Sequence, residues 1–248
     1  MDIWTACREE VSFLTIEGEA LRIVESQEQV ATNSLVDSLA EQSLLEEMLD
    51  RSKPPLPAGA EGLHYLLATP FRYPPLPCGS RFGRRFEPSL YYASQKLVTA
   101  LSEAAYYRLV FWSGMEESPP SSRLMTQHTV FAAHYRTLTG LQLQLPPFAR
   151  YEKCLTDPGD YTTTHQLGSA MRAEGVTAFE YISARDPGKG INVALYSPEA
   201  FTSNEPLYQQ SWLCETRADR VVFARSSDMY QFNLGAYLIN GLFPQPAL

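Results

Sequence analysis

Short apolar runs and alternating positions after residue 88 predict most of the strands of this chain. The run at residues 89–93 (Ser-Leu-Tyr-Tyr-Ala) has no polar face and therefore predicts a buried strand. Leucine and glutamine alternate over residues 141–145, which predicts the second arm of a hairpin that spans 124–145 and turns at Thr139-Gly140. Further strands are predicted at 177–183, 191–196, 207–216, 220–225 and 229–234.

Apolar residues at helical spacing predict helices at 35–49, 95–112 and 161–174. Asn33-Ser34 offers a cap for the first helix and Ser94 a cap for the second. The prolines between residues 54 and 57 end the first helix and form a stiff connector. Because the strands come in runs with few helices between them, the pattern favours the α+β class over a regular βαβ winding.

The acidic residues are concentrated at the start of the chain. Residues 1–53 contain twelve Asp and Glu against four Lys and Arg, a net charge of −8 that equals the formal charge of the whole chain. We therefore predict an acidic helical extension at 1–57 and a main domain at 58–248. Its helix is interpreted as a solvated amphipathic helix packed on the main domain. The alternative is a contact with a partner or with a second copy of the chain.

Composition and motifs argue against several functional classes. An acidic chain without a long basic stripe is a poor candidate for direct nucleic-acid binding. No apolar run is long enough to span a membrane, and the first residues lack the features of a secretion signal. The four cysteines have no paired spacing, which predicts reduced thiols in a cytoplasmic protein. The sequence has no glycine-rich nucleotide-binding motif, no GxSxG elbow and no histidine spacing typical of a metal site.

The candidate chemistry is concentrated between residues 71 and 108. Arg72 and Arg81 could each match a pair of phosphate oxygens, because a guanidinium presents its donors as a planar fork. Tyrosines between them could stack on a base or a nicotinamide ring. Glu103, on the helix predicted at 95–112, could stabilise an oxocarbenium-like sugar. Taken singly, a helical glutamate and loop arginines are more often solvated surface residues, so the argument rests on their convergence in one segment.

Two segments carry a resemblance to a known family: SRFGRRFEPSLYYASQKLVTALSEAAYYR and GVTAFEYISARDPGKGINVALYSPEAF. They resemble the RES-domain family, which is named for an arginine, a glutamate and a serine and whose members are toxins of bacterial toxin–antitoxin pairs. The resemblance covers about residues 60–230. One departure is that the family's common GGRW is here Gly79-Ser80-Arg81-Phe82, with phenylalanine in place of tryptophan.

The resemblance implies a fold similar to that of ADP-ribosyltransferases, a split and mostly antiparallel sheet with a cleft for NAD, and attack on the nicotinamide–ribose bond without a metal. Members either degrade NAD, with phosphate or water as the acceptor, or transfer ADP-ribose to a protein. The implied catalytic residues are Glu103, Arg81, Tyr92 and Ser183. The implied substrate-binding residues are Arg72, Tyr73, Tyr91 and Arg185. Alternation along a strand lets only one of Tyr91 and Tyr92 face the cleft, and the sequence leaves open which one.

The same resemblance implies partners. These are NAD, a co-encoded Xre-type antitoxin and, depending on the acceptor, inorganic phosphate, with a second copy of the chain as a further candidate. The alternative hypothesis is a non-catalytic interaction module with a RES-like fold. The combination of Arg72, Arg81, Glu103 and Ser183 favours an enzyme, because a binding module does not need all four.

Overall fold

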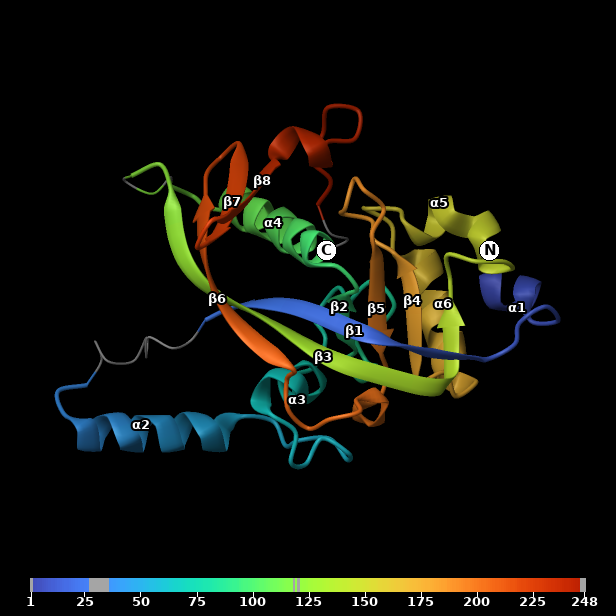
Figure 1. Ribbon diagram of the computed structural model, residues 1–248, viewed down its shortest axis with the longest axis horizontal. Helices are drawn as coiled ribbons and strands as arrows, with labels where there is room; N and C mark the ends of the chain where they lie inside the picture. The colour runs from blue at the N-terminus through green and yellow to red at the C-terminus, as the bar shows by residue number, and fades with distance from the viewer. Residues whose placement is uncertain (1, 27–35, 118, 120, 246–248) are drawn as a thin grey trace.

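The computed structural model describes residues 2–26, 36–117, 119 and 121–245 and shows an α+β protein built on one mixed sheet (Figure 1). The strands are β1 (Leu14–Glu25), β2 (Tyr91–Ser94), β3 (Leu124–Gln142), β4 (Ala178–Ile182), β5 (Ile191–Leu195), β6 (Tyr208–Thr216), β7 (Arg220–Arg225) and β8 (Asp228–Asn233). In the described residues they form one eight-stranded sheet in the order β1-β2-β5-β4-β3-β6-β7-β8. Neighbours are antiparallel except for the parallel pair β3–β4, which confirms the predicted α+β, mostly antiparallel class.

The sheet closes on itself at one end, because β1 pairs with β3 as well as with β2. The long β1–β3 pairing runs from Leu14 opposite Gly140 to Glu25 opposite His128, and Figure 1 shows the two strands as curved ribbons that cross the molecule side by side. The cycle β1-β2-β5-β4-β3 therefore has no free edge between its members. Strands β6, β7 and β8 continue from β3 as an antiparallel meander and confirm the strands predicted at 207–216, 220–225 and 229–234.

The prediction of a helical extension over residues 1–57 is wrong for residues 14–25, which form β1. Ile16 and Ala20 are buried while Glu17 and Glu19 are exposed, so this segment has the two-residue period of a strand. The predicted first helix is present as α2 (Leu39–Ser52), whereas its predicted cap at residues 33–34 lies outside the described residues. The boundary near residue 57 stays a prediction.

The predicted hairpin at 124–145 is also wrong, because β3 continues through Thr139-Gly140. Gly140 is needed there for packing, since a Cβ atom at this position would lie 2.4 Å from Cγ1 of Ile16 on β1. A glycine within a strand pattern thus marks the close approach of two strands and no turn.

The helices lie around the sheet as α1 (Ile3–Cys7), α3 (Tyr65–Arg72), α4 (Leu97–Ser113), α5 (Glu152–Leu155) and α6 (Thr162–Ala173). Helices α4 and α6 confirm two predicted helices, whereas α3 forms in a segment for which no helix was predicted. The predicted cap Ser94 is wrong: Lys96 occupies the cap position of α4, and the Ser94 hydroxyl donates to Oδ1 of Asn192 over 2.6 Å. None of the described helices combines the length and apolar character needed to cross a bilayer.

The two faces of β2 contact different parts of the molecule. Tyr91 and Ala93 belong to a core that includes α3, whereas Tyr92 packs against the core that includes α6. Ser94 lies on the same side as Tyr92, because its partner Asn192 contacts Glu103 of α4. The candidate chemistry is therefore divided between two sides of the sheet, which we call the α3 face and the α4 face.

Candidate active site

Glu103 lies on the α4 face, half-buried, with its carboxylate between the ends of two adjacent strands. Its Oε1 accepts a hydrogen bond of 2.5 Å from the Ser183 hydroxyl and one of 2.7 Å from Nδ2 of Asn192. Ser183 directly follows β4 and Asn192 lies near the start of β5, and these strands pair with Tyr181 opposite Asn192. The structure thus brings together Glu103 and Ser183, two of the residues predicted from the sequence.

Both donors to Glu103 have only one orientation available. The Ser183 hydroxyl oxygen accepts from the backbone N–H groups of Arg185 (3.1 Å) and Asp186 (2.9 Å), so its proton points at Glu103. Oδ1 of Asn192 accepts from Ser94, so the Asn192 amide nitrogen faces Glu103. In the described part of the chain Oε2 of Glu103 has no hydrogen-bond partner, which leaves this oxygen available to a ligand.

Asn192 was not predicted from the sequence. The only local signal is a polar residue in the apolar strand run Ile-Asn-Val-Ala-Leu, and that signal has no meaning until the β4–β5 register is known. Asn192 is buried, with 4% of its surface exposed, so an amide at this position needs polar partners. Ser94 and Glu103 supply them.

A tight turn over residues 80–83 positions the arginine of the first motif. The Ser80 N–H donates to the Gly83 carbonyl over 2.8 Å, and the buried Phe82 ring contacts Phe179 at 4.8 Å between centroids. The Tyr92 hydroxyl lies under this turn: it accepts from the Phe82 N–H (3.0 Å) and is 2.9 Å from the Ser80 hydroxyl. Burial raises the pKa of Tyr92 to about 12. Tyr92 therefore acts as a neutral support for the turn on the α4 face.

Two arginines meet at Tyr161. The Arg81 guanidinium lies over the Tyr161 ring at 4.6 Å and donates to the Asp157 carbonyl over 2.8 Å. Arg185 is buried, lies 3.7 Å above the Tyr106 ring, and donates to the Tyr161 hydroxyl over 3.2 Å. Rings and carbonyl oxygens hold both groups, and within the described ranges neither forms an ion pair with a carboxylate. Their positive charges remain available to an anionic ligand.

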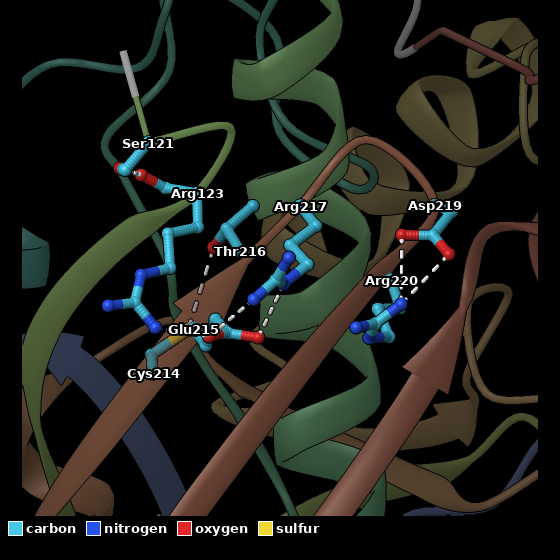
Figure 2. Close-up of polar contacts among 8 residues, drawn as sticks. All are labelled: Ser121, Arg123, Cys214, Glu215, Thr216, Arg217, Asp219 and Arg220. Atoms are coloured by element: carbon cyan, nitrogen blue, oxygen red, sulfur yellow. Dashed lines mark hydrogen bonds and ion pairs between the residues drawn. The ribbon is translucent and has the colours of Figure 1, made fainter. Parts of the chain in front are cut away.

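A second arginine cluster differs from the pair at Tyr161, because its arginines form ion pairs with carboxylates. At the β6–β7 turn Glu215 pairs with Arg123 (3.4 Å) and Arg217 (2.7 Å), and Asp219 pairs with Arg220 (3.0 Å), as Figure 2 shows. These side chains are partly exposed to solvent, so the pairs contribute little to stability. Each of these three arginines has a carboxylate partner, whereas the partners of Arg81 and Arg185 in the described residues are rings, a hydroxyl and carbonyl oxygens.

The charges of Glu103 and Arg81 act on the same tyrosines. Burial raises the pKa of Tyr106 to about 12, the positive charges of Arg185 and Arg81 oppose this rise, and Glu103 adds to it. Burial raises the pKa of Tyr181 well above its ordinary value, and Glu103 raises it further while Arg81 lowers it. The carboxylate and the guanidinium therefore lie around one tyrosine-lined region, in which both hydroxyls stay protonated at neutral pH.

Three predicted substrate-binding residues lie outside this cluster. Tyr91 is fully buried on the α3 face against Phe71 (6.1 Å) and Phe201 (4.9 Å), so a substrate contact by Tyr91 is incompatible with its position. This settles that Tyr92, of the two, shares a face with Glu103. Arg72 ends α3 and donates to the Pro54 carbonyl, and Tyr73 is exposed. Roles for Arg72 and Tyr73 toward a ligand stay predictions.

The site of this α+β protein combines a clamped helical carboxylate with two arginines that form no ion pair among the described residues. The family model for the RES domain matches residues 56–217, more than half of the chain, and the chain belongs to this family. At the level of the family this gives a toxin–antitoxin-type, NAD-related role. No curated protein matches the chain. Glu103, Ser183, Asn192 and both arginines beside Tyr161 lie inside the matched segment.

Proposed function

We propose that this chain is the toxin of a toxin–antitoxin pair and that it cleaves the nicotinamide–ribose bond of NAD in the cytoplasm. The observation that supports the proposal best is the Glu103 carboxylate, which two oriented donors hold by one oxygen while the other oxygen remains available. As nicotinamide leaves, positive charge develops on the ribose. A carboxylate fixed beside it stabilises that charge without having to reorganise.

The arginines fit the other half of NAD. A pyrophosphate carries two negative charges, and the Arg81 guanidinium keeps donors beyond those used for the Asp157 carbonyl. Arg185 adds positive potential from a buried position in which solvent screens it poorly. In this proposal Arg81 binds the phosphates directly, and Arg185 contributes through its charge and through the contacts that hold Tyr161.

The acceptor is decided after the bond has broken. Phosphate, water and a protein side chain can all attack the same oxocarbenium-like ribose, so NAD phosphorolysis, hydrolysis and protein ADP-ribosylation share this step. We favour degradation of NAD, with protein ADP-ribosylation as the alternative. A non-catalytic interaction module is the remaining hypothesis, and the clamped carboxylate together with two arginines that have no carboxylate partner in the described ranges argues against it.

The test is to mix the purified protein with NAD, with and without inorganic phosphate, and to determine the mass of every product that contains ADP-ribose. A sugar phosphate, free ADP-ribose or a mass increase on a protein would identify phosphate, water or a side chain as the acceptor. Glu103→Gln should abolish most of the turnover, and Glu116→Gln, at an exposed position just beyond α4, is the matched control. Absence of NAD loss with the wild-type protein would refute the proposed activity.

The second part of the proposal concerns the partner. An Xre-type antitoxin would silence the enzyme by placing a carboxylate-ended segment beside Arg81, where the phosphates of NAD would otherwise bind. Competition tests this: saturating antitoxin should prevent NAD binding. If NAD still binds while turnover stops, the antitoxin acts through conformation instead.

A further inference from the structure

The chain beyond the family match returns to the helix that carries Glu103. The family match ends at residue 217, whereas the described chain continues through β7, β8 and a short 3-10 helix, η4 (Leu234–Tyr237), to residue 245. The last part of this segment packs on α4. The rings of Tyr237 and Phe243 lie 6.0 and 5.3 Å from that of Tyr106, and Tyr237 is buried. Tyr106 is one helical turn after Glu103.

Tyr237 is hydrogen-bonded to the residue that precedes Glu103. Its hydroxyl is 3.1 Å from the Ser102 hydroxyl and donates to the Ser102 carbonyl over 3.0 Å. The Ser102 hydroxyl donates to the Arg185 carbonyl over 2.9 Å. Each hydroxyl has one proton: that of Ser102 goes to the Arg185 carbonyl and that of Tyr237 to the Ser102 carbonyl, so the bond to this carbonyl is the one that ties Tyr237 to α4. Both hydroxyls are buried, so each has a defined role in this network.

These bonds form a continuous path to the carboxylate. Tyr237 holds Ser102, and Ser102 holds the Arg185 carbonyl. The Arg185 N–H donates to the Ser183 hydroxyl, which in turn donates to Glu103. Because Ser102 and Glu103 are neighbours on α4, these hydrogen bonds and the backbone between the two residues form a closed ring. Tyr237 is bonded to this ring at Ser102.

A second tether reaches the arginines. The Tyr106 hydroxyl donates to the Pro244 carbonyl over 2.6 Å, which fixes the ring on which the Arg185 guanidinium lies at 3.7 Å. Arg185 then holds Tyr161, the ring that lies against Arg81. A pocket of about 110 Å³ lies between the 184–187 loop and residues 236–244, so these two segments are not closely packed on each other. The hydrogen bonds therefore link the C-terminal segment to the site in addition to the apolar packing of Tyr237 and Phe243 on α4.

We infer that residues 234–245 are a positioning element of the active site and that Tyr237 is its key residue, acting on Glu103 through Ser102, Arg185 and Ser183. The inference rests on the proposed function in that the positioned carboxylate is taken to be catalytic. Tyr237 itself does not touch substrate in this account. It holds the 183–185 turn at the distance from α4 at which Ser183 can donate to Glu103.

The decisive variant is Tyr237→Phe, which keeps the ring on Tyr106 and removes only the hydroxyl. We expect kcat for NAD to fall roughly tenfold with KM changed less than about twofold, because a displaced carboxylate weakens the transition state more than substrate binding. Tyr230→Phe, on β8 beside Trp212, is the matched control and should behave as wild type. In a Ser183→Ala background, Tyr237→Phe should cost less than about twofold, since the path is already broken.

Backbone hydrogen exchange gives a readout that does not depend on activity. The amides of Arg185 and Asp186 donate to Ser183, and their exchange should accelerate at least about tenfold in Tyr237→Phe but not in Tyr230→Phe. Equal loss of kcat in both backgrounds would reduce Tyr237 to a residue that only stabilises the fold, and unchanged exchange with unchanged kcat would overturn the inference. If the wild-type protein does not consume NAD, the proposed function fails, while the exchange experiment still decides whether Tyr237 positions the turn.

Discussion

Glu103 is held by two residues whose own hydrogen bonds leave them no other orientation, and this determines what its substitution should do. Glu103→Gln keeps the size of the side chain and an oxygen that can still accept from Ser183 and Asn192. Only the charge is lost. We expect kcat to fall about a hundredfold or more with little change in KM, because the charge matters in the transition state. Steady-state kinetics with NAD measure both constants, and wild-type turnover would exclude Glu103 as the catalytic carboxylate.

Arg81 should not tolerate a lysine, although the charge would be kept. The guanidinium lies over the Tyr161 ring and also donates to the Asp157 carbonyl, and a lysine ammonium cannot do both while presenting a two-pronged face to a phosphate. Arg81→Lys should raise KM for NAD by roughly tenfold. Arg84→Lys, an exposed arginine of the same segment, is the control. Equal KM values for both variants would show that Arg81 does not bind the ligand.

His128 on β3 makes the stability depend on pH. Burial, followed by the charge of Arg108, lowers its pKa to about 4, whereas an unfolded histidine titrates near 6.5. Below pH 6.5 the unfolded chain takes up a proton that the folded chain refuses. The free energy of unfolding should therefore be highest above about pH 6.5 and should decrease toward pH 4, by up to about 3 kcal/mol in total. Urea unfolding across this range should show a flatter profile for His128→Gln, with His134→Gln as the control for loss of a histidine from the same strand.

At the scale of elements, the site depends on how closely the 185–190 turn approaches α4. Asp186 accepts from Thr99 of α4 over 2.8 Å and from the Gly188 N–H over 2.9 Å. At Gly190 an added Cβ atom would lie 1.9 Å from the Thr99 hydroxyl oxygen. The turn that positions Ser183 can therefore dock on the helix only because residue 190 has no side chain.

Gly190→Ala should accordingly disturb both stability and site geometry. The turn must move away from α4, at a cost of about 1–3 kcal/mol, and Ser183 moves with it. Thermal unfolding and NAD turnover should both decline. Gly114→Ala, at the end of α4, is the control, because the added atom would make only ordinary contacts of 3.6 and 3.7 Å with the carbonyl oxygens of Val110 and Phe111. A Gly190→Ala protein with wild-type melting temperature and turnover would mean that the turn adapts without affecting Ser183.

At the scale of the whole molecule, the sequence predicted those elements whose signal is local. Strands β4 and β5 are mostly apolar runs, each with a single polar residue, and α6 has clear ends, so each was found within one or two residues. Strand β1 was missed because the acidic residues of this part of the chain suggested a helical extension. The sequence does place Glu17 and Glu19 between the apolar residues Ile16 and Ala20, and the structure shows that the glutamates are exposed and the apolar residues buried. The role of Gly140 could not be predicted, because it depends on the distant Ile16.

The same distinction applies to the site. Glu103, Arg81 and Ser183 could be named because they lie in motifs that resemble a family. Asn192 and Tyr161 could not, because their roles follow from the β4–β5 register and from the approach of Arg81 and Arg185 to one ring. Nor could the sequence assign Tyr91 and Tyr92 to opposite faces of the sheet, since both are aromatic and both suit a strand.

Two elements of the N-terminal extension, β1 and α2, contact the rest of the molecule differently, so each has to be tested by its own variant. Strand β1 pairs with β3 along nearly its whole length. Helix α2 instead lies apart from the sheet (Figure 1), and its side chains Leu39, Leu44 and Met48 are exposed. Deleting residues 1–53 would remove both. Since β1 contributes the buried Ile16, Ala20 and Leu21, its loss should exceed the stability of about 5–15 kcal/mol that a folded domain has.

Two variants separate the roles of β1 and α2. A chain lacking residues 1–25 should show no cooperative thermal transition by circular dichroism. A chain in which residues 39–52 are replaced by glycine and serine at equal length should melt cooperatively and keep NAD turnover within about twofold of wild type, because the exposed leucines of α2 stabilise no core. If the antitoxin no longer binds this second, folded chain, α2 is its docking surface. Cooperative melting of the first chain at the wild-type temperature would instead show that residues 1–25 are an appendage, as the charge distribution alone had suggested.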